Sequence, residues 1–188
     1  MSSNFSHITN PKPVIIPVSD RLFYIADNIT KTRNQFLVSQ TSAHMIDKRR
    51  FISDVAKLLF KRKVHQPPVT EKSLRMKEAE IGASLFGSTT TKKHIMFFHE
   101  DRANWYFYQG IIDVVNSKQT TESLTLHYEV RQNDILRIDN NKGKIGYMIL
   151  NGQELKNFLS AVEMYYRLVM GQLYNIDVTA DKTLQQPL

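Results

Sequence analysis

The chain has 188 residues, a net charge of +7 and no cysteine, and 41% of its residues are hydrophobic and 23% charged. This composition is ordinary for one globular domain with an appendage or for two very small domains, and without cysteine the chain cannot use disulfides, thiol nucleophiles or cysteine-ligated metal centres. No apolar run approaches the ~18 residues that span a bilayer, and the first residues lack the basic segment of a signal peptide, so we expect a soluble cytoplasmic protein.

Positive charge is concentrated in the first part of the chain. Residues 1–77 contain 14 Lys and Arg against 5 Asp and Glu, whereas residues 78–188 contain 11 against 13. Solubility requires a net charge but does not require this segregation. The distribution therefore predicts an anionic partner for the first part alone.

The chain is expected to divide into three regions: an extended arm over residues 1–19, a basic helical region over 20–68, and an α+β domain over 69–188. The arm holds three of the six prolines and little apolar periodicity. In the second region a helical apolar pattern begins at Leu22, becomes looser near Phe36, and leads into a strong amphipathic helix predicted over 43–63. Pro67 and Pro68 prevent that helix from continuing.

The third region begins with a helix that Thr70 caps and Gly87 ends. The pattern then changes to that of strands, in five segments rich in aromatic and β-branched residues: 93–99, 104–112, 123–130, 134–138 and 144–150. Asn151 and Glu154 are expected to cap a long last helix with a broad apolar stripe. The predicted fold is α+β, an antiparallel four- to five-stranded meander with this helix packed on it, preceded by N-terminal helices.

The segment 94–110 is dense in aromatic residues and histidine. Strand alternation sends Phe97 to one face of the sheet and Phe98 to the other, and both faces are mainly apolar, as in a strand covered on both sides. We expect the C-terminal helix to cover one face and the helix over 70–86 to cover the other, which buries Trp105 in the core. The alternative is an open aromatic face that stacks on bases, although the signature of RNA-binding sheets is absent.

The turn from His99 to Arg102, together with His127 and Glu129, is the candidate for an enzyme site. Consecutive charged residues in a tight turn are more typical of solvated positions. No zinc-ligand spacing, phosphate-binding loop or nucleophile elbow occurs in the sequence. We therefore predict no catalytic residue, metal or cofactor, and no small-molecule substrate.

The candidate binding site is the basic helix over 47–63. Seven cations are predicted to contact an anionic partner: Lys48, Arg49, Arg50, Lys57, Lys61, Arg62 and Lys63. The leading interpretation is a non-catalytic binding or adaptor protein whose partner is nucleic acid or an acidic protein surface. An alternative is that the same helix attaches to an anionic membrane surface. The simplest interpretation is that the cations only form a solvated face of the helix.

Several short motifs in the second half carry a resemblance. The residues concerned are Glu80, Gly82, Leu85, Phe86, Gly87, Phe97, Phe98, Asp101, Trp105, Tyr128, Glu129, Val130, Arg131, Glu154, Leu155, Asn157 and Phe158. Over about residues 78–178 the chain resembles a family of small uncharacterised proteins from Saccharibacteria-type candidate-phylum bacteria. The resemblance implies no activity, cofactor or site residue.

Overall fold

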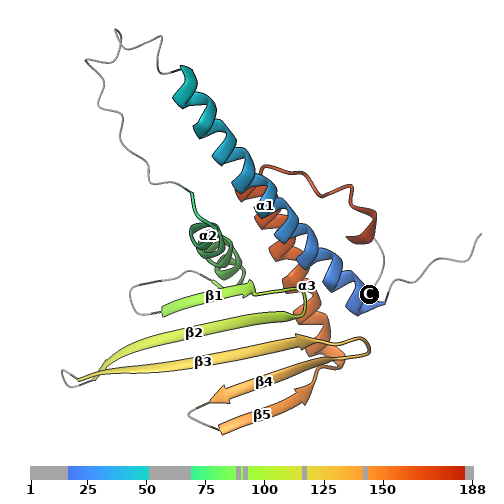
Figure 1. Cartoon of the computed structure of the whole chain (residues 1–188). Coiled ribbons are helices and arrows are strands. Elements are labelled where there is room, and N and C mark those ends of the chain that lie inside the picture. Colours follow the sequence, from blue (N-terminus) through green and yellow to red (C-terminus); the bar gives the residue numbers. More distant parts are fainter. Residues whose placement is uncertain are drawn as a thin grey trace, which may run out of the picture.

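The computed structural model describes residues 17–50, 69–87, 90, 93–115, 118–141 and 144–184, without the side chains of 41–50, 113–121, 141 and 182. In chain order the main elements are α1 (Val18–Arg50), α2 (Glu71–Ala83), β1 (Lys93–His99), β2 (Asn104–Val115), β3 (Lys118–Val130), β4 (Ile135–Asn141), β5 (Lys144–Ile149) and α3 (Gly152–Leu168). Short helical turns follow α2 at Ser84–Phe86 and α3 at Val169–Leu173, and a third lies at Lys182–Leu184. The predicted α+β fold is confirmed (Figure 1).

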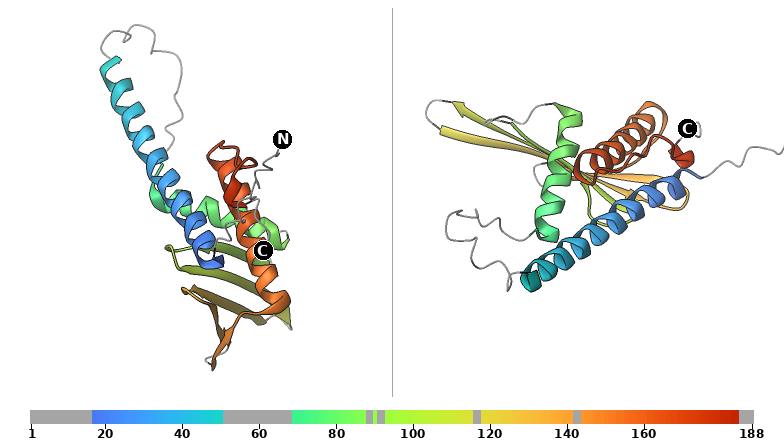
Figure 2. Two further views of the ribbon diagram at one scale, coloured as in Figure 1. Left: turned by 90° about the vertical axis from the view of Figure 1, so that its right-hand side faces the viewer. Right: turned by 90° about the horizontal axis from the view of Figure 1, so that it is seen from above.

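The sheet is an antiparallel meander with the strand order β1-β2-β3-β4-β5. Each strand pairs with its neighbour in sequence, so short links suffice. We call the side that carries Ile95, Phe97 and Trp105 the inner face, and the side that carries Phe98 and Tyr106 the outer face. Helix α3 crosses the inner face (Figures 1 and 2).

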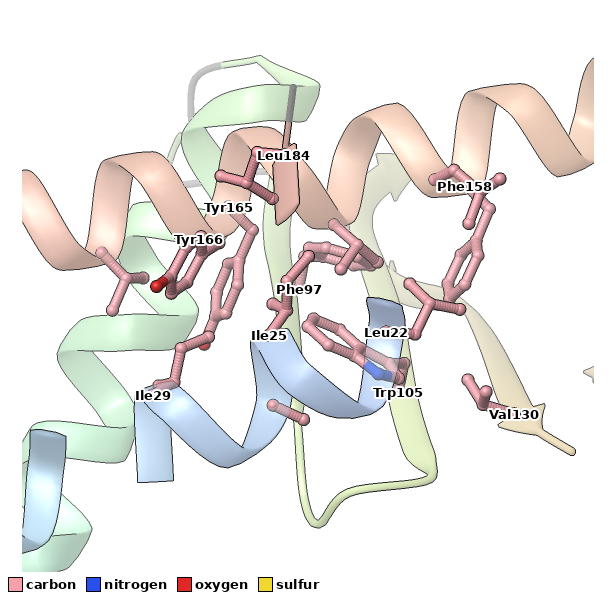
Figure 3. Close-up of a cluster of buried hydrophobic side chains, with 14 of the residues drawn as sticks. Leu22, Ile25, Ile29, Phe97, Trp105, Val130, Phe158, Tyr165, Tyr166 and Leu184 are labelled. Atoms are coloured by element: carbon pink, nitrogen blue, oxygen red, sulfur yellow. The ribbon is translucent and has the colours of Figure 1, made fainter. Parts of the chain in front are cut away.

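The core lies between the inner face, α3 and the first turns of α1 (Figure 3). Trp105, Tyr165 and Val162 are fully buried, and the rings of Trp105 and Tyr165 meet edge to face at 5.6 Å. Aromatic rings bury large apolar areas, and this geometry adds to their attraction. The prediction that Trp105 belongs to the core is therefore confirmed.

Helix α1 differs from the prediction in two ways: it has no looser stretch near Phe36, and no separate helix begins at residue 43. It is one continuous helix, so the looser stretch near Phe36 is helical, and residues 43–50 form its end. Phe36 lies edge to face with Tyr174 at 5.7 Å, a tertiary contact that supports this part of the helix. The remainder of the predicted helix over 43–63, and the arm up to residue 16, lie outside the described residues.

The predicted boundary at residue 69 does not separate two cores. Leu22, Ile25 and Ile29 on α1 are buried in the same cluster as Phe97 and Trp105. Arg21 also forms an ion pair with Glu163 on α3 and donates to the carbonyl oxygen of Leu184. The first turns of α1 therefore belong to the α+β body.

Helix α2 begins as expected and packs differently from the prediction. Ser73 N–H donates to the Thr70 hydroxyl at 3.2 Å, and Gly87 follows with a φ of +107°, a backbone angle that favours glycine. Instead of covering the outer face, α2 crosses the edge of the sheet at β1 (Figure 2). A Cβ atom on Gly82 would lie 2.1 Å from the Phe97 carbonyl oxygen, so glycine permits this close approach.

Helix α3 begins at the predicted place, but without the predicted cap. Asn151 occupies the N-cap position and its side chain makes no capping hydrogen bond. Glu154 forms an ion pair with Arg137 on β4, and this contact turns it away from a reciprocal cap. The apolar stripe carries the packing, with Phe158, Leu159, Val162, Tyr165 and Tyr166 all buried.

Candidate functional site

The predicted cation cluster is only partly within the described chain. Lys48, Arg49 and Arg50 lie at the end of α1, where the backbone is helical and the side chains are outside the described set. Lys57, Lys61, Arg62 and Lys63 lie outside the described residues altogether. Their contact with an anionic partner therefore stays a prediction.

The residues of the enzyme alternative are only partly brought together: the Asn104 amide links His127 to Asp101, whereas His99 lies on the opposite face of the sheet. His99 is only 1% exposed on the inner face, which corrects the prediction that it is a solvated turn residue. His127 lies on the outer face, where its Nε2 is 2.7 Å from Asn104 Oδ1. Glu129 is bound to Arg131, and within the described ranges no group of His, Asp and Glu could hold a metal.

The turn itself is built by Asp101. Its carboxylate accepts hydrogen bonds from the backbone N–H of Ala103 at 2.8 Å and of Asn104 at 2.9 Å. Desolvation opposes the shift, but the hydrogen bonds from the Asn104 side chain and then from these two N–H groups lower the pKa of the Asp101 carboxyl. Glu100, Asp101 and Arg102 are exposed, as expected. Asp101 is thus a structural residue of the turn.

A buried ionic network, which the sequence did not indicate, joins α1, α2 and the segment that follows α3. Arg33 on α1 donates to both carboxylate oxygens of Glu78 on α2, from Nε at 2.9 Å and from an Nη at 2.6 Å. The Tyr174 hydroxyl donates to the same carboxylate at 2.5 Å. Burial alone would lower the pKa of Arg33, but its hydrogen bonds to Glu78 and the Glu78 charge raise it. Because both charged side chains are at most 2% exposed, the network holds the fold and is closed to ligands.

His99 borders this network as a neutral residue. Its Nε2 lies 3.5 Å from an Nη of Arg33, and its Nδ1 lies 3.3 Å from the Asp101 carbonyl oxygen. These neighbours require Nδ1 to donate and Nε2 to accept. Desolvation and then the Arg33 charge lower the pKa of His99 to about 4.

Acidification is therefore expected to destabilise the protein through His99. The unfolded chain binds the imidazole proton near its ordinary pKa of about 6.5, before the folded chain does. The stabilisation is complete above that pH and is lost as the pH falls towards 4, by about 3 kcal/mol in total. Urea unfolding at pH 7.5, 5.5 and 4 measures the loss, and His99→Gln is expected to show a shallower dependence. Equal slopes for both chains would contradict the prediction.

A groove lies where the N-terminal half of α2 overhangs the outer face. Its volume is about 670 Å³, and its lining is formed by Glu71, Lys72, Arg75, Met76, Ala79, Met96, Phe98, Glu100 and Tyr106. Two methionines and two aromatic rings make the lining mainly apolar. Grooves of this kind receive apolar groups, and methionine adapts its shape to them.

Two cations stand at the α2 side of the groove. Arg75 donates to Glu71 at 2.9 Å and to the Glu100 carbonyl oxygen at 3.0 Å, so its guanidinium is held in place. Lys72 adds a second positive charge. On the floor, the Tyr106 hydroxyl is hydrogen-bonded to the Glu100 carboxylate, and desolvation, followed by this bond, raises the pKa of Tyr106.

The floor of the groove continues as a row across all five strands. Cross-strand pairing aligns Phe98, Tyr106, His127, Ile138 and Tyr147 in that order. Phe98 and Tyr106 stack at 5.5 Å, and Tyr106 and His127 stack at 4.7 Å. The ring faces are thus turned towards one another along the row and not outward.

Fold and groove together define an α+β protein with an antiparallel meander and an apolar surface groove with basic residues at its side. Comparison of the chain with models of protein families, with curated proteins and with solved structures gives no match. None of the helices in the described ranges combines the length and the apolar character of a membrane span.

Proposed function

We propose that the protein is a non-catalytic binding protein whose groove holds an acidic segment of another protein through that segment's apolar side chains. The groove lining carries the proposal, because Met76, Met96, Phe98 and Tyr106 leave an apolar surface open beside the cations of Lys72 and Arg75. An amphipathic peptide with apolar anchors and acidic neighbours matches this combination.

The basic segment strengthens the proposal by its position in the chain. Lys63 is eight residues before Glu71 at the groove, and a fully extended chain of that length spans at most about 29 Å. In the sequence, Lys61, Arg62 and Lys63 thus precede the helix that lines the groove by at most ten residues. They add the positive charge that attracts an acidic partner.

Single-stranded nucleic acid is the less favoured anionic partner. Base stacking needs exposed ring faces, and the outer-face rings of Tyr106 and His127 are stacked on each other with an interplanar angle of 7°. Glu71 and Glu100 also balance Lys72 and Arg75 at the groove. These carboxylates weaken the attraction for any anion, but nucleic acid depends on phosphate contacts for much of its affinity, whereas a peptide can also bind through its apolar side chains.

The test compares two glutamate substitutions at similarly exposed methionines. Met76, 57% exposed, lines the groove, and Met164, 51% exposed, lies on α3 away from it. Each purified variant is used to capture proteins from nuclease-treated lysate of cells that make this protein. Met76→Glu is expected to weaken capture at least about tenfold, since a carboxylate opposes both apolar and acidic groups, which corresponds to about 1.4 kcal/mol. Met164→Glu is expected to behave as the parent.

In a second variant, Lys61, Arg62 and Lys63 are changed to Glu. We expect this variant to capture the same proteins more weakly, and we expect the remaining binding to depend less on salt concentration. Circular dichroism melting checks that each variant remains folded. Capture that depends on undigested nucleic acid would instead support the nucleic-acid alternative. Capture that is equal for the parent and Met76→Glu would exclude the groove as the binding site.

A further inference from the structure

The two edges of the sheet differ in what lies beside them. Helix α2 crosses the edge at β1, whereas Figure 1 and the left-hand view of Figure 2 show no described element beside the outer edge of β5. Every residue of β5 is exposed, and its exposed large apolar residues are Ile145, Tyr147, Met148 and Ile149. An apolar free edge offers unpaired backbone groups to another strand.

The sequence and pairing of β5 itself provide none of the usual protections of an edge strand. It contains no proline, its register with β4 runs without a bulge, and its only charged residue is Lys144 at the start. Proteins commonly use these devices to keep free edges from pairing. Their absence from a strand of this composition indicates an edge that is built to pair.

The direction of the backbone groups on β5 follows from one hydrogen bond. Leu150 N–H donates to the Ile135 carbonyl oxygen at 2.9 Å, so residue 150 points its backbone groups towards β4. Because these directions alternate along an antiparallel strand, Ile145, Tyr147 and Ile149 point theirs away from the sheet. The three outward residues read Ile-Tyr-Ile, the same in both directions.

We propose that β5 pairs with β5 of a second copy, antiparallel about a two-fold axis at Tyr147, to form one ten-stranded sheet. Tyr147 then lies opposite its own counterpart, and Ile145 lies opposite Ile149 of the other copy. Both kinds of pair are apolar and exchange backbone hydrogen bonds, which makes the edge complementary to itself. The palindromic order of the outward residues is what identifies a second copy as the occupant.

The outer face and the charges agree with this pairing. Tyr147 ends the row that starts at Phe98, so the pairing continues the row into the second copy. The two Lys144 residues stand at opposite ends of the paired strands, about 20 Å apart, which is beyond the screening length of about 8 Å. Because only one short strand of each copy takes part, we expect the contact to bury less surface than a standard protein–protein interface. We therefore expect a dimer that dissociates in the micromolar range.

The register can be tested with single cysteines because the chain has none of its own. In Tyr147→Cys the two Cα atoms lie about 5.5 Å apart, within the range of a disulfide, whereas in Ile145→Cys they lie about 14 Å apart. Mild oxidation of the full chain is expected to cross-link the first variant and not the second. Equal cross-linking of both variants, or of neither, would overturn the proposed pairing.

Sedimentation equilibrium of the uncross-linked protein tests the association itself. The parent is expected to dimerise with rising concentration, and Tyr147→Lys is expected to weaken the dimer at least about tenfold. Val38→Lys is the matched control, since Val38 on α1 is 66% exposed and Tyr147 is 67% exposed. Met76→Glu should still dimerise, which separates this inference from the groove. A parent that stays monomeric at all concentrations, or a dimer that persists in Tyr147→Lys, would refute it.

Discussion

Arg33→Met is expected to lower the free energy of unfolding by about 3–5 kcal/mol, the usual cost of leaving one charge of a buried ion pair without its partner. Of the side-chain hydrogen bonds that Glu78 makes within the described ranges, the one from Tyr174 would remain, in a site that is almost closed to solvent. Its carboxylate would then have to be desolvated without a compensating cation. Urea unfolding at pH 7.5, followed by circular dichroism, measures the change.

Two further variants separate the charge from the packing. Replacing Arg33 and Glu78 together by Met and Leu is expected to recover much of the loss, because no uncompensated charge remains. Arg75→Met removes an ion pair with Glu71 whose side chains are 39% and 54% exposed, and should cost less than about 1 kcal/mol. A loss of that small size for Arg33→Met as well would show that the buried network contributes little to stability.

A chain of residues 69–188 is expected not to unfold cooperatively, although the sequence alone favours its independence. It lacks Leu22, Ile25 and Ile29, each of which stabilises a core by about 1.5–3 kcal/mol when buried. It also lacks Arg33, so Glu78 would be left without its cation. The combined loss is comparable with the whole stability of a typical domain, about 5–15 kcal/mol.

Thermal and urea unfolding of that fragment, with Trp105 emission as a second probe, measure the outcome. A chain of residues 17–188 serves as the control, because it keeps α1, and is expected to unfold as the full chain does. In the fragment, Trp105 should already emit at long wavelength before denaturant is added. A sharp transition with short-wavelength emission would show that α1 is dispensable for the core.

Local periodicity determined most of the secondary structure. The alternation in the five strands, the turn residues between them and the stripe from Phe158 to Tyr166 each act over a few neighbouring residues, so their consequences can be derived without the rest of the chain. The Thr70 cap is equally local. The meander, its order and the helix packed on it follow from the sequence for this reason.

The tertiary structure alone decided which polar residues are buried and which apolar ones stay open. Arg33 and Glu78 are 45 positions apart, on helices whose periodicity says nothing of their pairing. His99 is buried because the inner face of β1 turns it under α1 and α3. The groove exists because α2 crosses the β1 edge, where Gly82 lets it approach the backbone, and leaves Phe98 partly uncovered. These features depend on distances between elements, and no local pattern in a sequence specifies those distances.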